Sequence, residues 1–203
     1  MAIPGAREQW FPHCKGRQPM PLLSESVHAC LEPLRFLRSD GGRVVDAVRA
    51  RGARFPKASA LADPSLWVVG LLRTAAALRR GLGTSLGLST VLRLGFHIDV
   101  WTDDIGPGLR LPHPFNIVIG DGVEIGPGCT ILHGVTVQRG AGTRIGRGAV
   151  LANGTTVLAG STVGDGCLVG AASVVRGRIP AASVAVGAPA RVVRASRPGE
   201  AAP

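Results

Sequence analysis

Residues 119–137 read IGDGVEIGPGCTILHGVTV, and this stretch decides the fold of the chain. Its aliphatic residues Ile119, Ile125, Ile131 and Val137 recur at intervals of six. A helix repeats its apolar positions every three to four residues and a half-buried strand repeats them every second residue, so neither element explains this interval. The period indicates a repeat architecture in which each hexad forms one short strand and one turn.

The same register extends in both directions along the chain. With two slips of two residues, one near Ile117-Val118 and one near Ala141-Gly142, an aliphatic residue falls on every hexad position from 105 to 175. These positions are Ile105, Leu111, Ile119, Ile125, Ile131, Val137, Ile145, Leu151, Val157, Val163, Val169 and Val175. Small or apolar residues occupy the companion positions Val123, Cys129, Val135, Ala149, Thr155, Ser161, Cys167 and Ser173. We therefore predict a β-solenoid in which three hexads close one triangular coil, with these side chains stacked inside about four coils.

The amino-acid composition favours a solenoid and excludes other classes. Glycine accounts for 29 of 203 residues, 18 of them within 106–187, whereas Trp, Phe and Tyr number 3, 5 and 0. Glycine permits tight corners, and a narrow prism has room for Ile, Val and Leu but little for large rings. The hydrophobic content of 45% excludes a disordered chain, and glycine does not recur at every third residue as in collagen.

The first part of the chain predicts helices. Apolar residues spaced by three and four form an amphipathic stripe over 22–37, Gly41-Gly42 is expected to end that helix, and Val44 to Val48 suggest a second short one. A third helix should begin with Asp63 as its cap and Pro64 in its first turn, carry Arg79-Arg80 near its end, and stop at Gly81. Residues 86–94 suggest one more helix. We expect packing and oligomer contacts from these helices, with a basic helix lying on a membrane as the alternative.

These patterns divide the chain into three regions. We expect a helical N-terminal region at 1–95, a β-helix domain at 96–178, and a C-terminal cap and flexible tail at 179–203.

Charge and cysteine spacing narrow the partners. Lys and Arg number 23 against 13 Asp and Glu, a formal net charge of +10, but no basic run is interleaved with aromatics, which argues against nucleic-acid binding. The four cysteines lie far apart without a C-x-x-C pair, so they predict neither a disulfide framework nor a zinc site, and Cys129 and Cys167 should be core thiols. The N-terminus shows no apolar core of a signal peptide, and the longest apolar run, 66–72, is too short to span a bilayer. We therefore expect a cytoplasmic protein without a membrane partner.

Two histidines stand out within the repeats. His113 and His133 both occupy the third position of a hexad, a turn position that faces outward, so neither is expected in the core. On spacing alone, a functional histidine and an inconsequential surface histidine remain equal alternatives.

The segments around these histidines resemble a known family. The matching stretches are Ile98-Asp99, GLRLPHPFNIVIG at 108–120, ILHGVT at 131–136, GAASVV at 170–175 and VGAPARVV at 186–193. In this order they resemble the hexapeptide-repeat acyltransferases and, within them, the serine O-acetyltransferase family, over about residues 62–195. The resemblance implies a left-handed parallel β-helix, a homotrimer or a hexamer joined through the N-terminal helices, and acetyl-CoA as the donor.

The resemblance also implies a mechanism of direct acetyl transfer without a metal. His113 matches the family's catalytic histidine and would be the general base that accepts the proton of the acceptor hydroxyl. Asp99 matches the aspartate that orients this histidine, with a one-residue gap in the alignment, and Asp103 and Asp104 are the alternatives. His133 matches a position that walls the site or contacts the substrate.

Coenzyme A, by the same resemblance, would lie in a groove between two subunits. The backbone around Asn153 and Ala171 would contact its pantetheine arm, and Arg191 and Arg194 would meet its phosphates. Solvated tail charges are the alternative interpretation of these two arginines.

Two departures from the family put serine in doubt as the acceptor. Serine acetyltransferases carry an aspartate directly before the catalytic histidine, and this chain has Pro112 there. Their glycine-rich loop ends in Arg-His, whereas the shorter QRGAGTR at 138–144 has no histidine, so that Arg139 or Arg144 is the candidate replacement. We therefore expect O-acetylation of a hydroxyl on a sugar or small metabolite, with N-acetylation of an amino sugar and true serine acetylation as alternatives.

A hydratase and a non-catalytic scaffold are the alternatives from other function classes. A metal-dependent hydratase on the same solenoid needs three converging histidines, and the repeats hold only His113 and His133. A non-catalytic solenoid scaffold would not bind acetyl-CoA.

Overall fold

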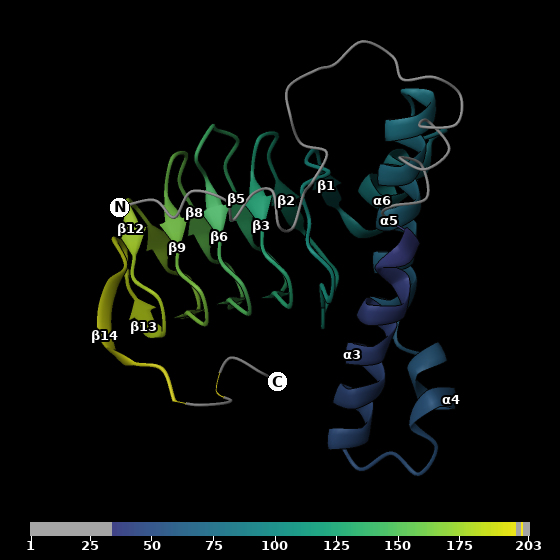
Figure 1. The fold of residues 1–203 in the computed structure, drawn as a ribbon, viewed down its shortest axis with the longest axis horizontal. Helices are drawn as coiled ribbons and strands as arrows, with labels where there is room; N and C mark the ends of the chain where they lie inside the picture. The colour runs from purple at the N-terminus through teal and green to yellow at the C-terminus, as the bar shows by residue number, and fades with distance from the viewer. Residues whose placement is uncertain (1–33, 198–199, 201–203) are drawn as a thin grey trace.

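A computed structural model describes residues 34–197 and residue 200. The helices gather at one end of the molecule, and the strands stack away from them as successive coils of a parallel β-solenoid (Figure 1). The helices are α3 (Leu37–Ala50), α4 (Pro56–Leu61), α5 (Pro64–Leu82) and α6 (Leu88–Phe96). Most of the helix predicted over 22–37 lies outside the described residues.

Three sheets form the faces of the prism. Sheet A contains β1 (Ile98–Val100), β2 (Ile117–Ile119), β5 (Thr136–Val137), β8 (Thr156–Val157) and β11 (Val174–Val175). Sheet B contains β3 (Glu124–Ile125), β6 (Arg144–Ile145), β9 (Thr162–Val163) and β12 (Arg178–Ile179). Sheet C contains β4 (Thr130–Ile131), β7 (Val150–Leu151), β10 (Leu168–Val169), β13 (Ser183–Val186) and β14 (Arg191–Ala195). Every pairing is parallel except that of β13 with β14, the antiparallel hairpin that closes the last coil.

The hexad register is confirmed by the core. All twelve predicted aliphatic positions are at most 2% exposed, and the eight companion positions are at most 1% exposed. Cys129 and Cys167 are buried, as predicted, and burial raises the pKa of the Cys129 thiol to about 12. The solenoid is thus stabilised by columns of small aliphatic side chains that bury their apolar surface coil after coil.

Both predicted slips of register are confirmed as longer corners. The path from Leu111 to Ile119 takes eight residues, whereas the equivalent path from Ile131 to Val137 takes six. The corner at 138–143 is longer by two in the same way: Val118 pairs with Thr136 and Glu124 pairs with Arg144, so the six residues from 118 to 124 correspond to eight from 136 to 144. In both places the sheets on either side keep their pairing.

Glycine is needed where one coil stacks closely on the next. A Cβ atom at Gly120 would lie 2.3 Å from the backbone nitrogen of Arg139, a distance that no side chain tolerates without a shift of the backbone. The solenoid therefore requires glycine here for space.

Two predicted helix ends are wrong. Helix α3 continues through Gly41-Gly42, because Asp40 and Val44 make buried contacts that exceed the cost of about 1 kcal/mol for a glycine inside a helix. Helix α5 ends at Leu82, with Gly83 rather than Gly81 adopting the left-handed conformation after it. Its predicted start is confirmed, since the Asp63 carboxylate accepts a hydrogen bond of 2.9 Å from the Ser65 N–H.

A buried ion pair joins the helices to the first coil. The Arg73 Nε of α5 donates to Asp40 Oδ2 of α3 at 2.9 Å, and both side chains are 3% exposed. Arg73 also donates to the carbonyl oxygens of Ile105 and Gly106, both at 2.7 Å, while Asp40 Oδ1 accepts from the Leu109 N–H at 2.8 Å. These bonds satisfy the two charges and fix the two helices on the end of the solenoid.

Among the residues that the structure describes, no helix combines the length and the apolar character that crossing a bilayer requires.

Candidate active site

One corner of the prism, where sheet C turns into sheet A, carries most of the predicted site residues. We call it the site corner; it comprises residues 112–116, 132–135, 152–155 and 170–173 in successive coils. The pairings of Arg110 with Thr130, Ile131 with Leu151 and Leu151 with Val169 place four residues in one column along it. These residues are His113, His133, Asn153 and Ala171.

The two histidines of this column are neighbours and face solvent. The ring centroids of His113 and His133 lie 5.9 Å apart at an interplanar angle of 74°, and both residues are exposed. His113 sits in the longer corner, in a turn where the Phe115 N–H donates to the His113 carbonyl oxygen at 2.8 Å. An exposed imidazole held in such a turn is accessible to a bound molecule.

Asp99 lies on β1, on the strand next to β2, but it is engaged elsewhere. Its Oδ1 is 3.4 Å from Arg93 Nη2 of α6, and the Arg93 guanidinium also lies 5.7 Å from the ring centre of Trp101. Within the described part of the chain no hydrogen bond joins Asp99 to His113. The structure therefore places the predicted orienting carboxylate near the site corner, in an ion pair with a helix residue.

The alternative carboxylates have different surroundings. Asp103 accepts hydrogen bonds from Arg79 at 2.6 and 3.2 Å, and its carbonyl oxygen accepts from Arg80 at 2.7 Å. Asp103 thereby joins the C-terminal part of α5 to the first coil. Asp104 is half-buried in the same turn, where its N–H donates to Thr102 Oγ1 at 3.1 Å.

The predicted cofactor residues continue the column away from His113. Asn153 and Ala171 are exposed at the site corner, and the Asn153 carbonyl oxygen accepts from the Ala172 N–H at 2.9 Å. Parallel strands are about 4.8 Å apart, so the three steps from His113 to Ala171 span roughly 14 Å. The column forms an extended, accessible edge.

The two C-terminal arginines lie at different ends of β14. Arg191 pairs with Val186, the last residue of β13, at the end of this strand that faces the site corner. Arg194 pairs with Val184, farther from that end of the strand. Arg194 Nη1 donates to Glu200 Oε2 at 2.8 Å. Arg191 is thus nearer to the column than Arg194.

Arg139 lies at another corner of the prism. It is exposed in the longer corner 138–143, where sheet A turns into sheet B, and Arg144 follows on β6. The structure of one chain does not bring either arginine to His113.

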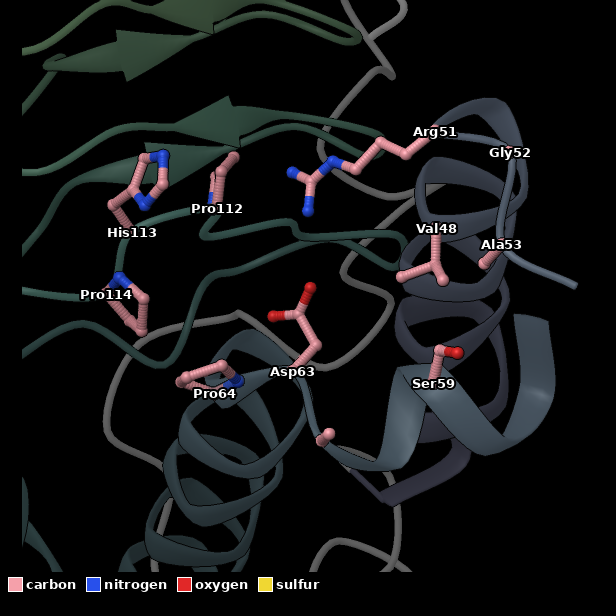
Figure 2. Close-up of a pocket in the computed structure, with 11 residues that line it drawn as sticks. Val48, Arg51, Gly52, Ala53, Ser59, Asp63, Pro64, Pro112, His113 and Pro114 are labelled. Carbon is pink, nitrogen blue, oxygen red and sulfur yellow. The ribbon is translucent and has the colours of Figure 1, made fainter. Parts of the chain in front are cut away.

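A pocket of about 530 Å³ opens beside His113, between the helices and the first coil. Its walls come from the end of α3, from α4, from the start of α5 and from Pro112, His113 and Pro114 (Figure 2). Figure 2 shows the Arg51 guanidinium and the Asp63 carboxylate pointing into the same space. Such a volume is typical of a small-molecule site.

Hydrogen bonds fix the walls of this pocket relative to His113. Ser65 Oγ of α5 accepts from the Leu111 N–H at 3.3 Å, two residues before His113. Arg43 of α3 donates to the Gly108 carbonyl oxygen at 3.0 Å and to Thr130 Oγ1 at 3.2 Å. The helices are therefore built onto the strand that leads into the site corner.

Sequence reasoning missed the contribution of Arg51 and found only a helix cap in Asp63. No local pattern marks Arg51, because its position in the pocket depends on how α3 packs on a coil more than fifty residues later in the chain. Among the described residues, no three His, Cys, Asp or Glu side chains form a group suited to hold a metal ion.

The fold and the site corner define the class of the protein: a hexapeptide-repeat β-solenoid preceded by helices, with histidines at an exposed corner. The chain matches no sequence model of a protein family, and no curated protein sequence matches it. Solved structures do match. The apoenzyme of soybean serine acetyltransferase is 32% identical, with 77% of this chain and 69% of that chain covered and a TM-score of 0.64.

The soybean enzyme complexed with serine is 27% identical, with coverage of 87% and 85% and a TM-score of 0.65. The serine acetyltransferase of Neisseria gonorrhoeae, at 23% identity, 87% and 71% coverage and a TM-score of 0.71, shares the fold. The chain belongs to the serine acetyltransferase-like family of hexapeptide-repeat transferases.

Proposed function

We propose that the protein is an acyltransferase that moves an acetyl group from acetyl-CoA to a hydroxyl group of a small metabolite or sugar, with His113 as the general base. The observation that carries this proposal is the position of His113. It is exposed at the head of the site corner and at the same time lines a pocket of small-molecule size. One residue thus faces a place for the acceptor and an extended edge for the donor.

The proposed reaction is a direct transfer. The His113 imidazole accepts the proton of the acceptor hydroxyl as its oxygen attacks the thioester carbonyl. A carbon–oxygen bond forms, the carbon–sulfur bond breaks, and the imidazolium returns the proton to the departing thiolate of coenzyme A. No covalent enzyme intermediate is needed, because the thioester is already activated.

Asp99 is proposed to stabilise the imidazolium form of His113. In the present arrangement its carboxylate pairs with Arg93, so this role requires the Asp99 side chain to turn from α6 toward the site corner. The pair is half-exposed, and exposed ion pairs contribute only about 0–1 kcal/mol, so the change is accessible.

The donor is proposed to lie along the column from His133 past Asn153 and Ala171. Arg191 is the better placed of the two C-terminal arginines to meet a phosphate, because Arg194 is paired with Glu200. We also propose a homotrimer: Arg139 lies at another corner and would reach an acceptor at His113 only from a neighbouring copy. Light scattering should then give three times the chain mass of 20.9 kDa.

Serine itself is the second candidate acceptor. The soybean structure in complex with serine, at 27% identity, favours it, whereas Pro112 in place of an acidic residue before His113 disfavours an amino acid. N-acetylation of an amino sugar uses the same base.

The test is thiol release from acetyl-CoA with a panel of serine, homoserine, sugars and aminoglycosides. His113→Ala should lower the rate with the best acceptor by about 10²- to 10⁴-fold, the range of general base catalysis, while leaving coenzyme A binding intact. Asp46→Ala is the control, since Asp46 is exposed on α3 and pairs with Arg49 outside the pocket and the column.

Two outcomes contradict the proposal. Full activity of His113→Ala would remove His113 from the mechanism. Failure of coenzyme A to raise the melting temperature of the wild-type protein would favour a non-catalytic scaffold, because a ligand that binds only the folded state stabilises it.

A further inference from the structure

The pocket beside His113 is lined by a cationic side chain, Arg51, that has no role in the proposed acetyl transfer. Arg51 follows directly after α3 and its guanidinium extends toward Pro112 (Figure 2). In the parts of the chain that the structure describes, the Arg51 side chain forms no hydrogen bond and no ion pair, whereas its backbone N–H donates to the Ala47 carbonyl oxygen at 3.2 Å. The Arg51 side chain therefore has its donors available to a molecule in the pocket.

The surroundings of Arg51 carry an excess of positive charge. Burial lowers the pKa of the Arg110 guanidinium, the nearby charges of Arg51 and Arg43 lower it further, and Asp63 acts in the opposite direction. Arg110 is 5% exposed, on the strand that leads to His113. The Arg110 guanidinium is thus close enough to the charges of Arg51, which lines the pocket, and of Arg43 to be repelled by both.

The one carboxylate that lines the pocket is already in use. Asp63 Oδ1 accepts from the Ser65 N–H and caps α5, so one of its two carboxylate oxygens already serves the helix. Both carboxylates of α3 are also engaged, since Asp40 accepts from Arg73 and from the Leu109 N–H, and Asp46 pairs with Arg49. A bound anion would reduce the repulsion among the arginines and accept the free donors of Arg51.

We infer that Arg51 selects an acceptor that carries an anionic group, a carboxylate or a phosphate, a few bonds from the hydroxyl that is acetylated. This inference rests on the proposed function and names its substrate class. The planar guanidinium suits both anions, because each offers two oxygens to parallel N–H donors. Held by Arg51 at one side of the pocket, the acceptor presents its hydroxyl to His113 at the other.

The first test measures binding without turnover. Calorimetry on the protein saturated with coenzyme A compares three ligands of the same carbon skeleton: glycerol, glycerate and glycerol 3-phosphate. At least one of the two anions should bind more tightly than glycerol, and Arg51→Ala should weaken that binding about tenfold to hundredfold, as expected for a hydrogen bond to a charged group. Arg51→Lys should retain part of the affinity, because it keeps the charge without the fork.

Arg49→Ala is the matched control. Arg49 lies on α3 two residues before Arg51, is exposed, and pairs with Asp46 outside the pocket. This variant should bind all three ligands as the wild type does. Equal anion binding by Arg51→Ala and the wild type, or no anion binding by either, overturns the inference.

The second test measures thiol release with the same three acceptors and the best acceptor of the panel. Arg51→Glu should shift the ratio of kcat/KM for anionic over neutral acceptors by at least about tenfold toward the neutral ones, mainly through KM. If the protein acetylates neutral acceptors and Arg51→Glu does not change the ratio of kcat/KM for anionic over neutral acceptors, the inference is overturned. The proposed function is then unaffected. Absence of transfer to every acceptor, together with Arg51-dependent anion binding, would instead contradict the proposed function.

Discussion

The solenoid and the helices of this protein are stabilised in opposite ways. Each coil of the solenoid repeats the one before it, with an aliphatic side chain at the same position and the same pairing between strands. The helices pack on the end of the same core through Val68, Val69 and Leu72 and add polar contacts that occur once, above all the pair of Asp40 and Arg73 with the carbonyl groups of the first coil. The contacts of the solenoid are spread over many equivalent residues, whereas the polar contacts of the helices are concentrated in a few.

The difference teaches where this protein is sensitive to change. Loss of one repeated contact leaves the equivalent contacts of the neighbouring coils in place. A buried charge that loses its only counter-charge stays uncompensated, which strongly destabilises the fold. The candidate acceptor pocket lies between the two regions, so its shape depends on the concentrated contacts more than on the repeated ones.

The largest effect is expected from removing the buried carboxylate. Asp40→Ala leaves the Arg73 charge uncompensated at 3% exposure, which should lower the free energy of unfolding by about 3–5 kcal/mol. Urea denaturation followed by circular dichroism measures the change. Asp46→Ala is the matched control, because Asp46 is on the same helix with an exposed ion pair, and it should change stability by less than about 1 kcal/mol. Similar losses in the free energy of unfolding for the two variants would show that the junction does not depend mainly on the pair of Asp40 and Arg73.

A smaller loss is expected from a glycine of the solenoid. Gly120→Ala would place a Cβ atom 2.3 Å from the backbone nitrogen of Arg139 in the next coil, so one coil must shift against the other. The expected cost is about 1–3 kcal/mol, the range for overpacking a tight interior. The same denaturation experiment measures it, and an unchanged midpoint would mean that the coils separate more easily than their stacking indicates.

The smallest effect should have the opposite sign. Gly42 lies inside α3, is exposed, and a Cβ atom there would contact nothing within 4 Å. Gly42→Ala should therefore raise the free energy of unfolding by about 0.5–1 kcal/mol, because alanine loses less backbone freedom on entering a helix. Gly42→Ala should raise the melting temperature and Gly120→Ala should lower it. The comparison distinguishes a glycine that a helix only tolerates from one that the solenoid requires. A loss of stability in Gly42→Ala would contradict this distinction.

The solenoid could be predicted from the sequence because its rule is local. The inward positions from Ile105 to Val175 follow from the period of six, and the two longer corners follow from the interruptions of that period. The left-handed conformation of Gly83 rather than Gly81, and the continuation of α3 through Gly41-Gly42, could not be predicted. Both depend on contacts with distant residues that outweigh local helix preferences.

The candidate site shows the same division. The register alone places His113, His133, Asn153 and Ala171 in one column, so this part follows directly from the sequence. The engagement of Asp99 by Arg93 and the entry of Arg51 into the pocket depend on how the helices pack, and no spacing in the sequence encodes either. The roles of these residues in catalysis and binding stay predictions.

The longer corner at 112–116 has a consequence for how such enzymes can diversify. Arg110 still pairs with Thr130 before it and Val118 with Thr136 after it, so the two extra residues are absorbed locally and the ladder of strands continues undisturbed. Insertions and deletions at a corner are therefore nearly independent of the rest of the scaffold. The surface at this corner can be remodelled by changing corner length, while the strand pairing of the later coils stays as it is.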